Sequence, residues 1–168
     1  KKRIIFHAPT RGLMGYTSRF LTLTKGTGVI NRIFHSFGKY TGDLEGRRNG
    51  ALISMASGKA VAFAIFNLQA RGEMFVTHND SVYEGMIVGL SSKSGDLEIN
   101  VMKGKQLTNM RTQGTDENVV LTPVRAMSIA EQLSMLNTDE ALEITPKSLR
   151  LRKSMLNPHD RKRKSKAS

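Results

Sequence analysis

The fold is decided by the stretch 97–118, LEINVMKGKQLTNMRTQGTDEN, in which an alternating pattern gives way to a polar segment without any pattern. In its first part three aliphatic side chains alternate with their neighbours, which predicts a half-buried strand over 97–102; they are Leu97, Ile99 and Val101. Residues 102–118 show neither alternation nor a helical stripe, so they are predicted to form a loop. A sheet that ends in this way is a rigid platform for a loop.

The predicted loop carries cations and neutral hydrogen-bonding groups and hardly any acids. At 17 residues it is longer than the usual connection, and such loops are usually functional or disordered. Its side chains suit phosphate and ribose, and the candidate RNA-binding residues are Lys103, Lys105, Gln106, Thr108, Asn109, Arg111 and Thr112. The late acids Asp116 and Glu117 either close the loop by pairing with its cations or face a ligand. A solvated mobile loop is the alternative that composition leaves open.

Positive charge is concentrated at the two ends of the chain. The net charge is +12 and the isoelectric point is about 10.3. Residues 1–50 and 147–168 each carry net +8, whereas residues 51–146 carry net −4. An excess of this kind favours a polyanionic partner, and nucleic acid is the obvious one.

Composition argues against several other classes of protein. Cysteine is absent, which excludes a disulfide frame, a thiolate metal site and a cysteine nucleophile, and which fits a reducing cytoplasm. The histidines are too widely spaced for a metal pattern; they are His7, His35, His78 and His159. No apolar run approaches the roughly 18 residues of a membrane span. Gly58 and Lys59 are followed by Ala60, so the chain has no phosphate-binding P-loop. We therefore predict no catalytic residue, no cofactor, no metal and no small-molecule substrate for this chain.

The first 42 residues are predicted to form a strand–helix–strand unit. Strands are expected at 2–8 and 29–37, with right-handed crossover making them parallel neighbours. Between them an apolar face repeats at helical spacing up to Gly26, through Leu13, Tyr16, Phe20 and Leu23. Two strands and one helix have too little core for a stable domain. Either the unit packs on the residues that follow, or its other half is missing, and we expect the second. Arg11 and Arg19 on this helix are either solvated charges or RNA contacts.

Residues 43–156 are predicted to form a mixed, mainly β domain with two short helices, after a glycine-rich linker. Strands are expected at 51–56, 73–76, 86–90, 97–102, 119–124, 143–144 and 148–152. The segment 60–70 fits a buried helix, although alternating Ala and Phe make a strand the alternative. Ser128 and Glu131 form a capping box for the second helix, which is expected to face the core through Ile129, Leu133 and Leu136. Asp139, Glu140 and Glu143 are interpreted as a solvated acidic face rather than an acid/base pair.

The last segment, 157–168, is predicted to be a basic flexible tail. Such tails add sequence-independent attraction to RNA. The candidate RNA-binding residues here are Arg161, Lys162, Arg163 and Lys164. The predicted class is thus α+β, in three parts: 1–42, 43–156 and 157–168.

Long strings of this sequence, in order along nearly the whole chain, resemble the BipA (TypA) family of translational GTPases, relatives of elongation factor G. They are PTRGLMGYTSRFLTLTKGTG (9–28), GRRNGALIS (46–54), GKAVAFA (58–64), LQARG (68–72), VYEGMI (82–87), LTNMR (107–111), GTDE (114–117) and TPKSLRLRK (145–153). One departure is Pro123 followed by Val124, where the family usually shows two prolines; it puts only the local turn in doubt.

The resemblance implies a fold and a set of partners. Residues 1–42 would be the C-terminal half of a ferredoxin-like unit like domain V of elongation factor G, and 43–156 the family's C-terminal domain. The implied partners are a bacterial-type ribosome, its large-subunit rRNA, and the acceptor end of A-site tRNA, met by the loop at 105–116. Roles in translation regulation and large-subunit assembly are implied too. GTP and Mg²⁺ would belong to a nucleotide domain absent from this chain. We expect a cytoplasmic monomer; the alternative is a generic basic nucleic-acid-binding module.

Overall fold

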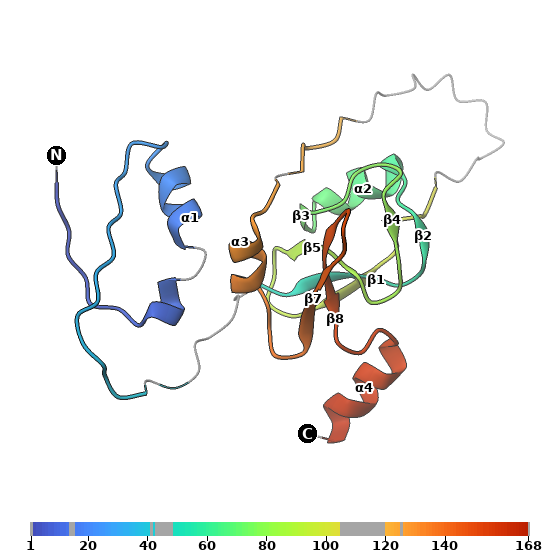
Figure 1. Ribbon diagram of the computed structural model, residues 1–168. Helices are drawn as coiled ribbons and strands as arrows, with labels where there is room; N and C mark the ends of the chain where they lie inside the picture. The colour runs from blue at the N-terminus through green and yellow to red at the C-terminus, as the bar shows by residue number, and fades with distance from the viewer. Residues whose placement is uncertain are drawn as a thin grey trace.

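The computed structural model describes residues 2–13, 16–40, 42, 49–104, 120–124 and 126–167, without the side chains of Ser18, Arg19 and Ala167. A four-stranded sheet with the order β3-β5-β1-β6 forms its centre (Figure 1). Strand β1 pairs antiparallel with β5 and parallel with β6, and β3 pairs antiparallel with β5. These strands are β1 (Ala51–Ser54), β3 (Gly72–Met74), β5 (Ile87–Ser91) and β6 (Leu97–Ile99). The predicted α+β class is confirmed.

Two antiparallel ribbons accompany the sheet. The short pair β2 (Gly58–Lys59) and β4 (Ser81–Val82) was not predicted from the sequence, because two residues show no alternation. The other ribbon is the hairpin of β7 (Glu140–Ile144) and β8 (Leu149–Lys153). Its turn is closed by Thr145 and Ser148, which exchange backbone and hydroxyl hydrogen bonds of 2.9–3.0 Å. The two strands expected on either side of Thr145 are therefore confirmed.

Strand β1 is buried on both faces, so the sheet has a core on each side. Leu52 belongs to the larger cluster, together with Ile65 of helix α2 (Ala62–Gln69). Ala51 and Ile53 belong to the smaller one, together with Leu151 of β8. The helix covers one face and the hairpin packs on the other (Figure 1). For the segment 60–70, the predicted helix is confirmed over the alternative strand.

Helix α3 (Ile129–Ser134) begins at the predicted capping box. The Ser128 hydroxyl accepts from the Glu131 N–H at 3.3 Å, and the Glu131 carboxylate accepts from the Ser128 N–H at 2.9 Å. Its expected core face is wrong for Ile129 and Leu133, which are 50% and 46% exposed, and is confirmed for Leu136, which packs against the smaller core cluster. The six-residue helix instead turns Gln132 inward, so its buried stripe is offset by one position.

In the N-terminal part a 3-10 turn, η1 (Thr10–Leu13), is followed by helix α1 (Tyr16–Leu23). The helix ends as predicted, with the Gly26 N–H donating to the Leu21 carbonyl at 2.7 Å and that of Lys25 donating to Thr22 at 3.1 Å. Both Lys25 and Gly26 have positive φ, as this kind of helix stop requires.

Three sequence predictions of local structure are wrong. Residues 2–8 and 29–37 are not strands, because strand pairing needs a ladder partner and the described residues supply none. Residues 120–124, the described part of the strand expected at 119–124, are not a strand either. The C-terminal segment, expected to lack regular structure, forms helix α4 (Pro158–Ala167). The domain boundaries at 42/43 and 156/157 stay a prediction. Within the described parts, no helix has the length and apolarity to cross a membrane.

Candidate nucleic-acid interface

A basic helix lies beyond the end of the hairpin (Figure 1). Asn157 caps α4, because its side-chain oxygen accepts from the His159 N–H at 2.8 Å. The first turn holds the only acid of the helix, Asp160. Four cations of the helix are exposed to solvent: Lys162, Arg163, Lys164 and Lys166. The arrangement is a compact cationic surface that suits a phosphate backbone.

Arg161 of the same helix turns the other way, toward the sheet. Its guanidinium forms an ion pair with Glu98 of β6 at 3.0 Å. It also donates to the carbonyls of Met155 and Leu156, at 3.0 Å for Met155. The Arg161 side chain is only 15% exposed and that of Glu98 29%, so solvent screens this pair less than a fully exposed one. Arg161 therefore anchors α4 to the edge strand of the sheet.

The strand that leads to α4 ends in a buried ammonium group. Lys153 is 1% exposed, and its Nζ lies 2.5 Å from Asp96, 2.7 Å from Asp139 and 2.9 Å from Glu140. Glu140 stands opposite Lys153 in the β7–β8 register, and its side chain is fully buried. The predicted solvated acidic face is therefore wrong for Glu140, whose carboxylate neutralises a core cation.

The environment of Lys153 keeps its ammonium charged. Burial by itself lowers the pKa of a lysine, since it disfavours the charged form. The hydrogen bonds to Asp139, Asp96 and Glu140 outweigh burial, so the pKa of Lys153 is raised above its ordinary 10.5. The lysine thus joins the β5–β6 connection, the start of β7 and the end of β8 through charge-assisted hydrogen bonds.

A second polar cluster lies on the other face of the hairpin. The Tyr83 hydroxyl donates to Glu143 at 2.7 Å, and Glu143 also pairs with Arg150 at 3.5 Å and Arg152 at 3.8 Å. Burial, together with the hydrogen bond and negative charge of Glu143, raises the pKa of Tyr83 to about 12. Tyr83 therefore keeps its proton in the folded chain over a pH range in which an exposed tyrosine ionises.

We expect this cluster to make stability fall at alkaline pH. The folded pKa of Tyr83 lies above the ordinary 10.0, so its contribution is complete below pH 10 and is lost as pH rises through about 12. The spectrophotometric titration curve of Tyr83→Phe, subtracted from that of the parent, should show one tyrosine ionising near pH 12. Glu143→Gln should move that ionisation toward 10. A difference titration centred at pH 10 in the parent would contradict the buried Tyr83–Glu143 contact.

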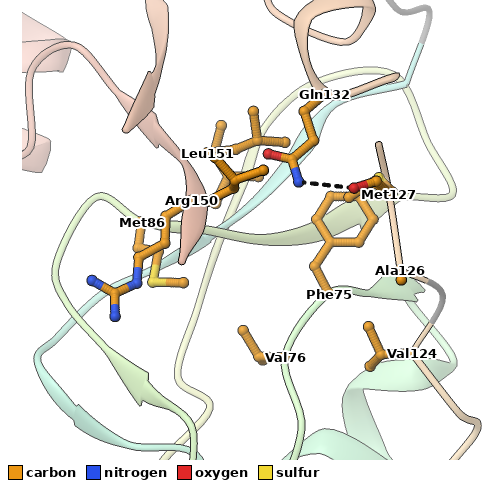
Figure 2. A pocket seen from close by; sticks show the side chains of 11 residues that line it. Phe75, Val76, Met86, Val124, Ala126, Met127, Gln132, Arg150 and Leu151 are labelled. Carbon is orange, nitrogen blue, oxygen red and sulfur yellow. Dashed lines mark hydrogen bonds between the residues drawn. The ribbon is translucent and has the colours of Figure 1, made fainter. Parts of the chain in front are cut away.

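A mostly apolar hollow of about 320 Å³ lies between α3 and the sheet, lined mainly by Phe75, Met86, Met127, Gln132 and Leu151 (Figure 2). Gln132 is 8% exposed, and its amide nitrogen donates to the Met127 carbonyl at 3.5 Å. Its Oε1 has no hydrogen-bond partner among the described residues, which costs stability in a buried setting. Among the residues predicted to bind RNA, none of those that the structure describes lines this hollow.

The structure brings only part of the predicted site together. Six loop residues lie outside the described part of the chain: Lys105, Gln106, Thr108, Asn109, Arg111 and Thr112. The same holds for Asp116, Glu117 and the side chain of Arg19. Lys103 is exposed where the described segment ends. Arg11 donates to the Gly42 carbonyl at 3.0 Å and stacks 4.8 Å from the Tyr40 ring centroid.

Sequence reasoning missed Glu98 and Lys153. For Lys153 a signal existed, because LRLRK alternates and places Lys153 on the same side as Leu151. For Glu98 there was none, since its partner Arg161 is 63 residues away. No cluster of three or more metal-ligating side chains occurs among the residues whose structure is described.

Comparison with known proteins agrees with the fold. Residues 1–48 match the family model of the elongation factor G C-terminus, a ferredoxin-like domain, and residues 49–158 match the TypA/BipA C-terminal domain. Fold and matches define the C-terminal region of a translation factor. The chain belongs to the TypA/BipA family. It corresponds to the C-terminal region of a family member and not to the catalytic domain.

Three similar curated proteins carry the name large ribosomal subunit assembly factor BipA. Identity is 46% with the protein of Escherichia coli (strain K12) over 166 residues, 98% of this chain and 27% of the relative. It is 45% with that of Bacillus subtilis (strain 168), over 98% of this chain and 27% of the relative. Identity is 47% with the protein of Buchnera aphidicola, over 96% of this chain and 27% of the relative. The chain thus spans about a quarter of the length of these relatives.

Proposed function

We propose that this chain is the ribosome-binding region of a TypA/BipA-type translational GTPase that takes part in large-subunit assembly and translation regulation. The observation that carries the proposal is the family match over residues 1–158, and the helix of exposed cations that follows the matched domain supports it. The relatives' name supplies the large subunit as partner. GTP and Mg²⁺ belong to the nucleotide domain of such a protein, and this chain alone does not hydrolyse GTP.

The proposed contacts divide between the loop and the basic ends. The predicted loop at 102–118 comes after β6, an edge strand of a well-packed sheet, and its residues 105–116 contact the acceptor end of A-site tRNA. The exposed cations of α4, with Arg11 and Arg19, meet large-subunit rRNA. The protein acts as a monomer in the cytoplasm.

Co-sedimentation with bacterial large ribosomal subunits over a salt series tests the function. We expect binding that weakens as salt increases, since released counterions drive phosphate contacts. Duplex DNA of similar total charge is the matched competitor. Equal binding to that DNA would favour the alternative, a generic basic nucleic-acid-binding module, over a ribosome-specific one.

Replacing Lys105 and Arg111 together by Ala is expected to weaken binding and reduce its salt dependence. If each cation neutralises one phosphate, the slope of log affinity against log salt should fall by roughly 1.4 to 1.8 units, at about 0.7 to 0.9 per phosphate. The melting temperature should stay near that of the parent, because the loop is poor in apolar groups and surface changes usually cost within about 0.5 kcal/mol. An unchanged slope would show that the basic ends alone carry the phosphate contacts.

Asn109→Ala is the matched control for that pair. Asn109 is neutral, so it is suited to a base edge or a ribose hydroxyl rather than to a phosphate. We expect a lower affinity with an unchanged salt slope. Loss of folding in either variant would instead indicate that the loop stabilises the fold, through ion pairs between its cations and Asp116 or Glu117.

A further inference from the structure

Helix α4 is too short and too charged to be stable by itself. It has 10 residues, and isolated helices below about 12–15 residues are marginal in water. Lys162 and Lys166 are four residues apart, so they repel each other on one face. The ion pair of Asp160 with Arg163 within the helix is 3.9 Å long and largely exposed, so it contributes little. The order of α4 must therefore come from contacts outside it.

Those contacts converge on Arg161 and the segment before the helix. Arg161 joins Glu98 to the carbonyls of Met155 and Leu156, as described above. The backbone of Leu156 also packs on Gly85, where an added Cβ would come within 2.6 Å of the Leu156 Cα. The base of α4 is thus held against the sheet, while its remaining cations stay exposed.

The exposed surface of α4 suits a polyanion and not an apolar partner. Its only apolar residues are Pro158 and Ala167, so it lacks the apolar centre of a typical protein–protein interface. A rigid set of cations also loses less side-chain and backbone entropy on binding than a disordered one does.

We propose that Glu98 positions α4 for RNA binding by holding Arg161, so that the exposed cations of the helix meet RNA phosphates as a prearranged set. In this arrangement Arg161 is a positioning residue and not an RNA contact. The inference rests on the proposed function, with the large ribosomal subunit as the RNA partner, and it turns a basic tail into an ordered docking element.

The decisive variant is Glu98→Gln, because pairing and net charge predict opposite results. The substitution adds one positive charge to the chain, so simple attraction to RNA should increase affinity. Loss of the pair with Arg161 should release α4 and instead lower affinity for large ribosomal subunits by about three- to tenfold. Glu73→Gln is the matched control, since Glu73 is exposed on β3 and has no ion pair among the described residues.

A second variant and a second measurement keep the outcome clear. Arg161→Lys retains the charge but loses the planar fork that reaches Glu98 and two carbonyls together, so affinity should fall as in Glu98→Gln. In both variants the α4 amides should exchange hydrogen faster, while those of β5 keep their protection. Affinity of Glu98→Gln equal to or above that of Glu73→Gln would overturn the inference. Failure of the parent chain to bind subunits would overturn the proposed function, and the inference with it.

Discussion

Lys153→Met is expected to destabilise the C-terminal fold by about 3–5 kcal/mol, the usual cost of removing one partner from a buried ion pair. Met fills a similar volume but leaves the fully buried Glu140 without its counter-ion. The connection that carries Asp96 would lose its attachment at the same time. Urea unfolding followed by circular dichroism measures the loss, and the exposed Lys147→Met is the matched control.

The register pair offers a rescue that tests the cause. Replacing Glu140 by Leu in the Lys153→Met chain removes the buried carboxylate that Lys153 neutralised, and apolar substitutes for buried ion pairs are often tolerated. We expect the double variant to recover much of the lost stability. Equal stability of Lys153→Met and Lys147→Met would contradict the buried cluster.

The same group should contribute a pH dependence. The folded pKa of Lys153 is raised above 10.5, so its stabilisation is complete below pH 10.5 and is lost as pH rises through the raised value. Unfolding free energies should therefore fall less steeply with alkaline pH in Lys153→Met than in the parent. Both are best measured in a Tyr83→Phe background, because Tyr83 ionises in an overlapping range.

Gly50→Ala is expected to cost about 3 kcal/mol, at the upper end of the usual penalty for overpacking. A Cβ at Gly50 would lie 1.7 Å from the Gly95 carbonyl oxygen and 2.0 Å from its carbon, so backbone must move. The Asp96 carboxylate accepts a hydrogen bond from the Ala51 N–H at 2.7 Å and pairs with Lys153. The backbone movement would pull Asp96 away from both partners.

Gly104→Ala is the control, because a Cβ at Gly104 would meet nothing within 4 Å. Its free energy of unfolding should stay close to that of the parent. Since Gly50 and Lys153 hold the same connection, the combined variant should lose less stability than the two single losses added together. Strict additivity would show that the connection between β5 and β6 does not couple them.

Several elements were predictable because their signals are local. The capping box of Ser128 and Glu131 involves residues three apart, and the stop of α1 needs only a few residues with the right φ values. The apolar face of α2 repeats at helical spacing, which favoured the helix, but the alternation of Ala and Phe left a strand open until the structure showed the helix. The predicted charge distribution likewise follows from composition alone.

The remaining features depend on partners distant in sequence. Alternation at 2–8 and 29–37 favours strands, but the described residues give these segments no ladder. The composition of 157–168 favours a flexible tail, yet the Arg161–Glu98 pair across 63 residues accompanies a helix there.

What the sequence by itself determined is therefore the α+β class, the helix ends, the loop without pattern, the basic ends and the family resemblance. Only the tertiary structure decided which charges are structural and which are exposed for binding. Each lysine or arginine adds one positive charge to the chain wherever it lies in the fold. Its role depends on the carboxylates that folding brings within hydrogen-bond distance. For Lys153 and Arg161 those carboxylates come from other segments of the chain, whereas Lys162 and Lys166 are exposed at the surface.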